Sequence, residues 1–245
     1  MHLYICIDDT DTRETIGTGK LAARLIETIE KQGFGTCGAI TRHQLYVHPD
    51  VPYTSHNSAM CFPAEIESTF LEPLISHCGK FLEEHSAAGS DPGLCVVVTE
   101  RLTAPDRLIA FGKLAKTAVL QKKDAYTVAR ELNIHLSEHG GTGQGVIGAL
   151  AGTGLRLTGN DGRFRGKHQI SGEKGIATVG SILQQANIDL VRTVDGEILA
   201  PDVKILLGEK IKSILQNHQS VLLVQPSTHS EAKWETCPKE YLKQF

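Results

Sequence analysis

Hydrophobic and polar positions over residues 1–47 predict a strand, a helix and a second strand. Residues 2–7 (HLYICI) are apolar and stop at an aspartate, as a short buried strand does. From Lys20 onward apolar residues recur at helical spacing until Gly33, so a helix is predicted to begin at or just after Thr18. Residues 39–47 predict the next strand. The order is therefore strand, acidic loop, helix, strand.

The middle of the chain alternates strand-like and helical patterns. It follows an irregular segment, HPDVPYTSHNSA, whose two prolines break regular structure. Strands are predicted at residues 59–66, 94–99 and 134–137, and helices at residues 68–84, 106–121 and 124–132, the last continuing the one before it. Such alternation predicts the α/β (α+β) fold class, with a ferredoxin-like or related sandwich in this region.

A second glycine-rich stretch, HGGTGQGVIGALAGTG, occupies residues 139–154. Seven glycines fall in these sixteen residues, with apolar residues among them. The pattern predicts a tight loop that leads into a short buried helix. Residues 176–225 then alternate strand-like and helical patterns again, and residues 226–245 are predicted to form a polar C-terminal tail.

Composition favours a globular protein. The 245 residues are 40% hydrophobic and carry a formal net charge of −3, so any nucleic-acid site must be a local basic patch. No apolar run reaches the roughly 18 residues of a membrane-spanning helix, and no signal peptide is evident; we expect a cytoplasmic protein. The six cysteines form no CxxC pair, which favours buried reduced thiols over zinc ligands or disulfides.

Three aspartates, Asp8, Asp9 and Asp11, directly follow the first predicted strand. Carboxylates this close repel one another unless a cation lies between them, and Mg²⁺ is a usual partner of ligands that are all oxygen. The three aspartates are therefore candidate metal ligands and catalytic residues. The alternative is a turn in which Asp8 and Asp11 cap backbone amides, and the acidic loop alone favours neither.

Thr18 lies between Gly17 and Gly19 at the predicted helix start, with Lys20 behind it. A helix N-terminus presents unpaired amides, and flanking glycines let these amides approach a phosphate. The stretch lacks the spacing of a Walker A loop, and Thr18 taken alone would be an ordinary N-cap. An acidic loop beside a phosphate-binding loop is, however, the combination that phosphoryl or nucleotidyl transfer uses.

Two further groups are weaker candidates. Gly143, Gly145 and Gly148 form a GxGxxG pattern, which indicates either a nucleotide clamp or a close approach of two backbones. A dinucleotide-binding (Rossmann) site is rejected, because no acidic residue follows at the end of a second strand. Arg42, His43 and the basic run RFRGKH are candidates for phosphate or RNA contacts, against the alternative of a solvated charged face.

Several ordered segments resemble a known family: YICIDDTDTRETIGTGKLA, TRHQLYVHPDVPYTSHNSA, DPGLCVVV, ARELNI and GQGVIGALAGTG. In this order they resemble archaeal tRNA(Ile) 2-agmatinylcytidine synthetase, which begins with an IDDTDS motif and carries a later G-x-G-L-I-G-A-L-A segment. The resemblance covers about the first 225 residues and thins after Gly154.

The resemblance implies an enzyme that uses ATP and agmatine to modify a tRNA cytidine, phosphorylating its C2 oxygen before the amine displaces it. It implies that Asp8, Asp9 and Asp11 hold Mg²⁺ and the ATP phosphates, and that Thr18 accepts or relays phosphate. The residues that it implies in or near the nucleotide site are Gly17, Gly19, Lys20, Arg42, Pro52, Tyr53, Asn57, Gly143, Gly145 and Gly148.

The resemblance also implies a kinase-like α/β domain at residues 1–58 and 139–175, and a ferredoxin-like domain at residues 59–138 and 176–225. The family's CTT step is Gly-Thr-Gly in this chain, and we expect its OB-fold and zinc-ribbon modules to be absent.

The sequence therefore favours a Mg²⁺- and ATP-dependent phosphotransferase or ligase that acts on RNA or a nucleoside. Its expected partners are a nucleotide, tRNA or other RNA, and a second copy of the chain, since exposed sheet edges permit a homodimer. The alternative is a non-catalytic nucleic-acid-binding or regulatory module on the same scaffold.

Overall fold

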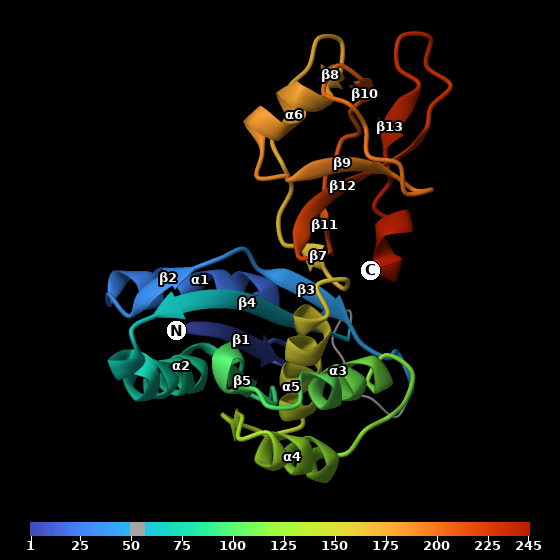
Figure 1. The fold of residues 1–245 in the computed structure, drawn as a ribbon. Coiled ribbons are helices and arrows are strands. Elements are labelled where there is room, and N and C mark those ends of the chain that lie inside the picture. Colours follow the sequence, from blue (N-terminus) through green and yellow to red (C-terminus); the bar gives the residue numbers. More distant parts are fainter. Residues whose placement is uncertain (50–56) are drawn as a thin grey trace. The chain divides into compact units, whose positions relative to one another are not determined.

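The computed structural model describes residues 1–49 and 57–245. Contacts within the chain divide it into two compact units, Met1–Thr158 and Gly159–Phe245 (Figure 1). Each unit has a hydrophobic core of its own. Among the described residues, no helix has both the length and the apolar character needed to cross a bilayer.

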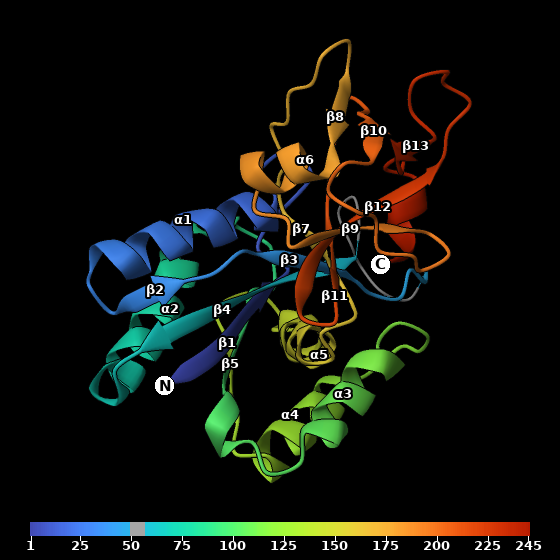
Figure 2. The ribbon, with the colours of Figure 1, turned by 45° about the horizontal axis from the view of Figure 1, so that its top comes forward.

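An antiparallel sheet forms the centre of the first unit. Its strand order is β6-β5-β1-β4-β3, and β2 also pairs with β4. β4, β1 and β5 lie side by side (Figure 2), where Ile7 of β1 is aligned with Met60 of β4 and with Leu94 of β5. The described strands are β1 (His2–Asp8), β2 (Gly35–Cys37), β3 (Thr41–Gln44), β4 (Ser58–Ile66), β5 (Gly93–Val98) and β6 (His135–Glu138).

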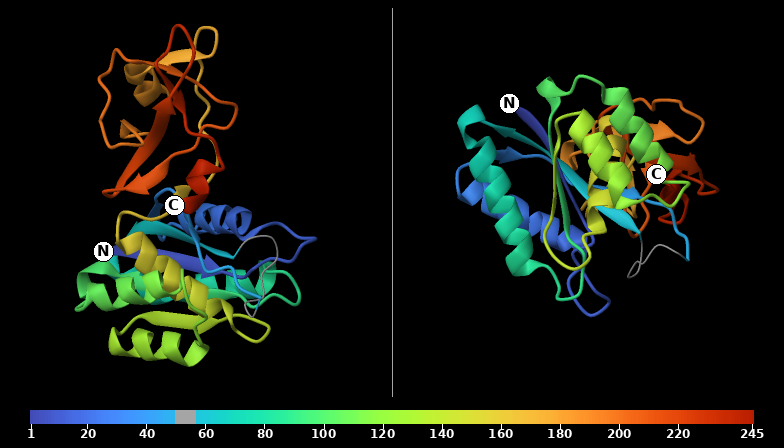
Figure 3. Two further views of the ribbon diagram at one scale, coloured as in Figure 1. Left: turned by 90° about the vertical axis from the view of Figure 1, so that its right-hand side faces the viewer. Right: turned by 90° about the horizontal axis from the view of Figure 1, so that it is seen from below.

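Helices cover both faces of this sheet (Figure 3). On one face α1 and α2 enclose a core that contains Ile5 and Ile7, and on the other α5 packs against Cys6 with α3 and α4 nearby. The helical elements of the unit are α1 (Thr18–Lys31), η1 (Ser68–Phe70), α2 (Leu71–His85), η2 (Thr99–Arg101), α3 (Pro105–Leu114), α4 (Lys122–Glu131) and α5 (Gly145–Leu157). The predicted mixed α and β class is confirmed.

The first strand and helix form where the sequence predicts them. β1 is buried from Ile5 to Asp8, and α1 begins at Thr18. α1 buries the face that carries Leu21, Leu25 and Ile29 because these residues share one side of the helix. The helix ends before Gly33, which has a φ of +73° that a glycine adopts without strain.

The glycine-rich stretch after β6 becomes a loop and the buried helix α5, as predicted. Eleven of the thirteen residues of α5 are buried. Its glycines permit close packing, because a Cβ on Gly152 would lie 2.7 Å from Sγ of Cys6. On the other side of α5, a Cβ on Gly154 would lie 2.3 Å from the carbonyl oxygen of Leu108 in α3. α5 is therefore held between the sheet and α3.

One predicted element differs. The helix expected to run from residue 106 to residue 132 is interrupted after Leu114, and α4 starts afresh at Lys122. The break ends at a local cap, since the backbone N–H of Gln121 donates to Oδ2 of Asp124 at 3.1 Å. Such a cap satisfies donors that a helix start leaves without partners, so it favours a new helix at this point.

The second unit is a small mixed sheet with one α-helix, α6 (Val179–Gln185), and a final 3₁₀ turn, η3 (Tyr241–Gln244). The strand order is β7-β11-β12-β13-β10-β8, with β9 parallel to β12. The strands are β7 (Arg163–Phe164), β8 (Ile176–Thr178), β9 (Leu190–Thr193), β10 (Lys204–Leu206), β11 (Ile214–Gln216), β12 (Gln219–Pro226) and β13 (Trp234–Thr236). The segment expected as a polar tail contributes β13 and the buried Cys237 and Leu242 to this unit.

The compact units follow a different division from the expected domains. We expected a boundary near residue 58, but β4 begins there and pairs with β1 in one sheet. Hydrogen bonding between β1 and β4 joins the segments that the sequence assigned to separate domains. The six cysteines are all free, and only Cys37 is not fully buried, which agrees with the expected reduced thiols.

Candidate functional site

The candidate site lies where β1 ends. Asp8 is the last residue of this strand, and it is only 9% exposed. A Cβ on Gly148 would lie 1.7 Å from Oδ2 of Asp8, so the first turns of α5 lie directly against this carboxylate. Gly145, the first residue of α5, is close to the same strand end, because its Cβ would lie 3.0 Å from the backbone oxygen of Asp8. The fold thus brings the acidic loop and the second glycine-rich stretch together.

Burial and negative neighbours set the electrostatics of this acidic loop. Burial, then the charge of Asp9 and that of Asp11, raises the pKa of Asp8 to about 8, although a backbone hydrogen bond from Asp9 lowers it. Burial, then the charges of Asp91 and Asp11, raises the pKa of Asp9 to about 6. Asp9 has a φ of +51°, in the left-handed region that aspartate adopts more readily than most residues. Burial and like charge therefore disfavour the ionised forms of Asp8 and Asp9 unless a cation compensates them.

Asp11 connects the acidic loop to the start of α1. The hydroxyl of Thr18 donates to Oδ1 of Asp11 at 2.8 Å, and Thr18 is only 6% exposed. A Cβ on Gly17 would lie 3.8 Å from Oδ2 of the same aspartate, so Gly17 also adjoins it. The predicted grouping of aspartates, threonine and glycines is therefore a spatial cluster in the structure.

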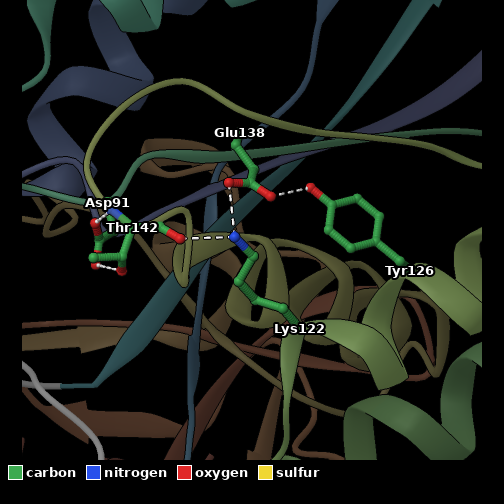
Figure 4. Close-up of polar contacts among 5 residues, drawn as sticks. All are labelled: Asp91, Lys122, Tyr126, Glu138 and Thr142. Atoms are coloured by element: carbon green, nitrogen blue, oxygen red, sulfur yellow. Dashed lines mark hydrogen bonds and ion pairs between the residues drawn. The ribbon is translucent and has the colours of Figure 1, made fainter.

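Asp91 completes this cluster, and the sequence did not single it out. Its carboxylate accepts from the backbone N–H of Thr142 and, at 2.8 Å, from the hydroxyl of Thr142 (Figure 4). The backbone N–H of Gly145 donates to the carbonyl oxygen of Asp91 at 3.0 Å. Asp91 thereby fixes the loop of residues 139–144 beside Asp9. Its position in a Ser-Asp-Pro-Gly linker indicates only a turn, so no local signal identifies it.

A second group of polar side chains holds the other side of that loop (Figure 4). Nζ of Lys122 donates to Oε2 of Glu138 at 2.8 Å and to the carbonyl oxygen of Thr142 at 2.7 Å. The hydroxyl of Tyr126 donates to Oε1 of Glu138 at 2.7 Å. A Cβ on Gly143 would lie 1.8 Å from Oε2 of Glu138, which places Gly143 against this group. None of Lys122, Tyr126 and Glu138 was expected to adjoin the site.

Other predicted residues lie at the margin of the cluster or have structural partners. Gly19 and Lys20 are in the first turn of α1, and Lys20 is exposed. Nε of Arg42 donates to the hydroxyl of Ser58 at 2.9 Å, across the β3–β4 pair. The side-chain amide of Asn57 donates to the carbonyl oxygen of Tyr46 at 2.7 Å and so closes the same hairpin. Pro52 and Tyr53 lie outside the described residues.

The basic run RFRGKH belongs to the second unit and is not uniformly a solvated face. Arg163 is 5% exposed, and burial lowers its pKa. Nε2 of His168 lies 2.8 Å from the hydroxyl of Ser213, and burial lowers the pKa of His168 as well. These two side chains therefore serve the packing of their own unit.

Comparisons with known proteins follow the predicted resemblance. No family model matches the chain. It is 30% identical to the tRNA 2-agmatinylcytidine synthetase TiaS of Archaeoglobus fulgidus over 161 residues, which are 64% of this chain and 36% of that enzyme. The TiaS of Methanosarcina acetivorans is 29% identical over 63% of this chain and 36% of its own. An uncharacterised protein of Methanocaldococcus jannaschii is 30% identical over 62% of this chain and 49% of its own.

Solved structures give the same result. The complex of TiaS with its isoleucine tRNA and ATP matches with a TM-score of 0.55 and 29% identity, over 63% of this chain and 36% of TiaS. The complex of TiaS with the same tRNA, AMPCPP and agmatine matches with a TM-score of 0.53 and 28% identity, over 62% of this chain and 36% of TiaS. The chain thus spans about a third of the length of the TiaS proteins that it matches. It is a distant homologue of the core of the tRNA 2-agmatinylcytidine synthetase TiaS, as its motifs predict.

Proposed function

We propose that the first unit binds a Mg²⁺–ATP complex and acts as a phosphotransferase or ligase on RNA or a nucleoside. The observation that carries this proposal is the position of Asp8, a buried carboxylate that feels the charges of Asp9 and Asp11 and lies against the first turns of α5. Burial together with like charge is costly unless a ligand compensates it, and such groups concentrate at functional sites.

The side chains of the acidic loop suit a hard divalent cation whose coordination shell a bound nucleotide would complete. Asp8, Asp9 and Asp11 offer only oxygen atoms, which Mg²⁺ prefers. Among the described residues, no three or more His, Cys, Asp or Glu side chains are arranged to hold a metal by themselves. Mg²⁺ commonly uses one or two carboxylates and takes its other ligands from substrate phosphates and water. Bound there, it would offset the charge that develops on a transferring phosphoryl group.

The same loop contains a buried polar atom without a hydrogen-bond partner in the described part of the chain. The hydroxyl of Thr10, between Asp9 and Asp11 in sequence, is buried and has no hydrogen-bond partner among the described residues. A buried hydroxyl without a partner is unfavourable, since it loses its water and gains nothing in return. A bound ligand at this loop would supply the missing partner.

Roles follow from these positions. Asp8, Asp9 and Asp11 would hold Mg²⁺ and the phosphates, and the hydroxyl of Thr18, which Asp11 orients, would accept or relay phosphate. The loop of residues 139–144 and the start of α5 would contact the nucleotide through Gly143, Gly145 and Gly148. The kinase-like and ferredoxin-like character of the expected domains stays a prediction, whereas their boundaries differ from those of the compact units.

The relatives support the choice of ligands. TiaS has been crystallised with its isoleucine tRNA and ATP, and with that tRNA, AMPCPP and agmatine. ATP, agmatine and tRNA are therefore the first ligands to test on this chain. Because the chain spans 36% of TiaS, the acceptor that it uses is itself part of the proposal.

The test is a thermal-shift titration with ATP, with and without Mg²⁺ and a chelator. ATP with Mg²⁺ is expected to stabilise the protein by about 2.7 kcal/mol at a hundredfold excess over Kd, and the chelator is expected to remove the effect. Asp9→Asn is expected to abolish the shift, whereas Asp202→Asn, at an exposed position of the second unit, is expected to keep it.

Label transfer then separates binding from chemistry. With γ-labelled ATP, Thr18→Val is expected to lose incorporation into the protein while it retains the thermal shift. Absence of any ATP-induced shift with every divalent cation tested would refute the proposed function.

A second candidate is a nucleic-acid-binding module without catalysis. Its support is the Gly-Thr-Gly that this chain has at the family's CTT step. Filter binding to tRNA distinguishes the two candidates. A module of this kind binds RNA without ATP, and its affinity falls steeply with salt because phosphate contacts release counterions.

A further inference from the structure

Glu138 and Asp8 occupy equivalent positions on opposite sides of one glycine. The antiparallel register aligns Asp8 of β1 with Gly93 of β5, and Gly93 with Glu138 of β6. Residues aligned across a sheet direct their side chains to the same face. A Cβ on Gly93 would lie 2.2 Å from the carbonyl carbon of Gly145, so the start of α5 lies directly over Gly93. The start of α5 is thus flanked by Asp8 and Glu138.

The loop that leads into α5 consists largely of glycine in unusual conformations. Gly140, Gly141 and Gly143 have φ values of +148°, +54° and +73°. Glycine loses more backbone freedom on ordering than other residues, so a free loop of this kind would sample many conformations. Two carboxylates confine this loop. A Cβ on Gly141 would lie 1.9 Å from Oδ1 of Asp91, and a Cβ on Gly143 would lie 1.8 Å from Oε2 of Glu138.

α4 holds the second of these carboxylates in place. Lys122 joins Glu138 to the loop through its bonds to Oε2 and to the carbonyl oxygen of Thr142. Tyr126, one turn further along α4, donates to the other oxygen of Glu138 (Figure 4). Charge-assisted bonds of this length are the stronger hydrogen bonds in proteins, so the three side chains act as one connected group.

We propose that Lys122, Tyr126 and Glu138 form a clamp that positions the loop of residues 139–144 for the phosphates of a nucleotide. This inference rests on the proposed function, and it adds three positioning residues to it. The clamp acts through the loop: it fixes the carbonyl of Thr142 and the backbone at Gly143. The ligand class is a nucleoside triphosphate, or another polyphosphate that reaches the start of α5.

The clamp is expected to strengthen nucleotide binding, because it orders the loop in advance. With the clamp intact, the loop is already ordered before the ligand arrives. Without it, binding has to restrict three glycines, and the lost freedom weakens the affinity. Removal of Lys122 is therefore expected to weaken ATP binding without touching the aspartates.

The experiment compares Lys122→Met and Glu138→Gln with Lys123→Met, which changes the neighbouring exposed lysine of the same helix. Hydrogen exchange of the full chain without nucleotide measures how often the loop opens. In the two clamp variants, the amides of residues 139–146 are expected to exchange about tenfold faster than in wild type, because the loss of a charged hydrogen bond has an effect of this size. In Lys123→Met they are expected to exchange at the wild-type rate. Lys122→Arg, which keeps the donors, is expected to restore slow exchange.

Titration of Mg²⁺–ATP into the same variants supplies the second measurement. The clamp variants are expected to bind about tenfold more weakly than wild type and than Lys123→Met. Tyr126→Phe removes one hydrogen bond and leaves the ring, so it provides a milder variant if Lys122→Met unfolds, with a smaller loss expected.

The two measurements separate the two proposals. If wild type binds no ATP, the proposed function fails, and the exchange rates still decide whether the clamp orders the loop. Wild-type exchange in Lys122→Met and Tyr126→Phe would overturn the clamp. Faster exchange with unchanged ATP affinity would overturn its role in positioning the loop for phosphates.

Discussion

Asp8 is placed where its ionised form is disfavoured. Burial and two neighbouring aspartates raise its pKa from 3.8 to about 8. An acid whose pKa is higher in the folded than in the unfolded state holds its proton more tightly when folded. Its contribution to stability is therefore complete below pH 4 and is lost as the pH rises toward 8. The residue proposed to bind a cation is therefore, without that cation, a source of instability.

Asp8→Asn is accordingly expected to raise the thermal midpoint at pH 8, measured without nucleotide or divalent cation. The gain is expected to be a few degrees, since each kcal/mol shifts the midpoint of a protein of this size by about 2–4 °C, and to vanish toward pH 4. The same variant is expected to lose the Mg²⁺–ATP shift. Asp106→Asn, at an exposed position of α3, is the control, and an equal midpoint for wild type and Asp8→Asn at pH 8 would contradict the interpretation.

α5 shows how an element can depend on residues that are poor helix formers. Glycine in a helix normally costs about 1 kcal/mol relative to alanine. In α5 the glycines are required because neighbouring atoms occupy the space of a side chain, namely Asp8 at Gly148, Cys6 at Gly152 and Leu108 at Gly154. Close packing of the helix against β1 and α3 depends on these missing methyl groups.

Gly148→Ala is therefore expected to destabilise the protein instead of stabilising it, and to abolish ATP binding by moving α5 away from Asp8. Gly154→Ala is the matched control, because it crowds α3 and leaves Asp8 untouched. It is expected to lose stability of order 1–3 kcal/mol, as overpacking does, with ATP affinity kept. Urea unfolding and ATP titration measure both effects; Gly148→Ala at wild-type stability would contradict the predicted crowding.

At the scale of the whole molecule, the residues of the proposed ATP site all belong to the first unit. Asp8, Asp9, Asp11, Thr18, Asp91 and the loop of residues 139–144 lie within Met1–Thr158. The second unit has its own core, including the buried Ile182, Val191 and Ile205. As proposed, the ATP site is built from residues of the first unit.

A fragment of residues 1–158 is expected to fold and to show the same Mg²⁺–ATP thermal shift as the full chain. A fragment of residues 159–245 is expected to show none. Circular dichroism establishes that each fragment is folded before the titration. A shift confined to the full chain, with the first fragment folded, would show that the site extends beyond the first unit.

Several elements of this protein could be predicted from its sequence, because local physical chemistry specifies them. The short apolar run of β1, the helical spacing of α1 and the glycine content before α5 each specify their own element, because burial patterns and backbone freedom act over a few residues. The same holds for the grouping of Asp8, Asp9, Asp11 and Thr18, which are close in sequence and stay close in space.

Only the tertiary structure decided which distant residues join that grouping. Asp91, Lys122 and Glu138 reach the site because antiparallel register aligns Glu138 with Gly93 and Asp8, and because α4 begins anew at Lys122. A one-residue slip of register would turn Glu138 to the other face of the sheet. Register and helix packing depend on the whole core, which no short window of sequence contains, so the acidic loop was predictable and the contacts of Lys122 and Glu138 with the loop of residues 139–144 were not.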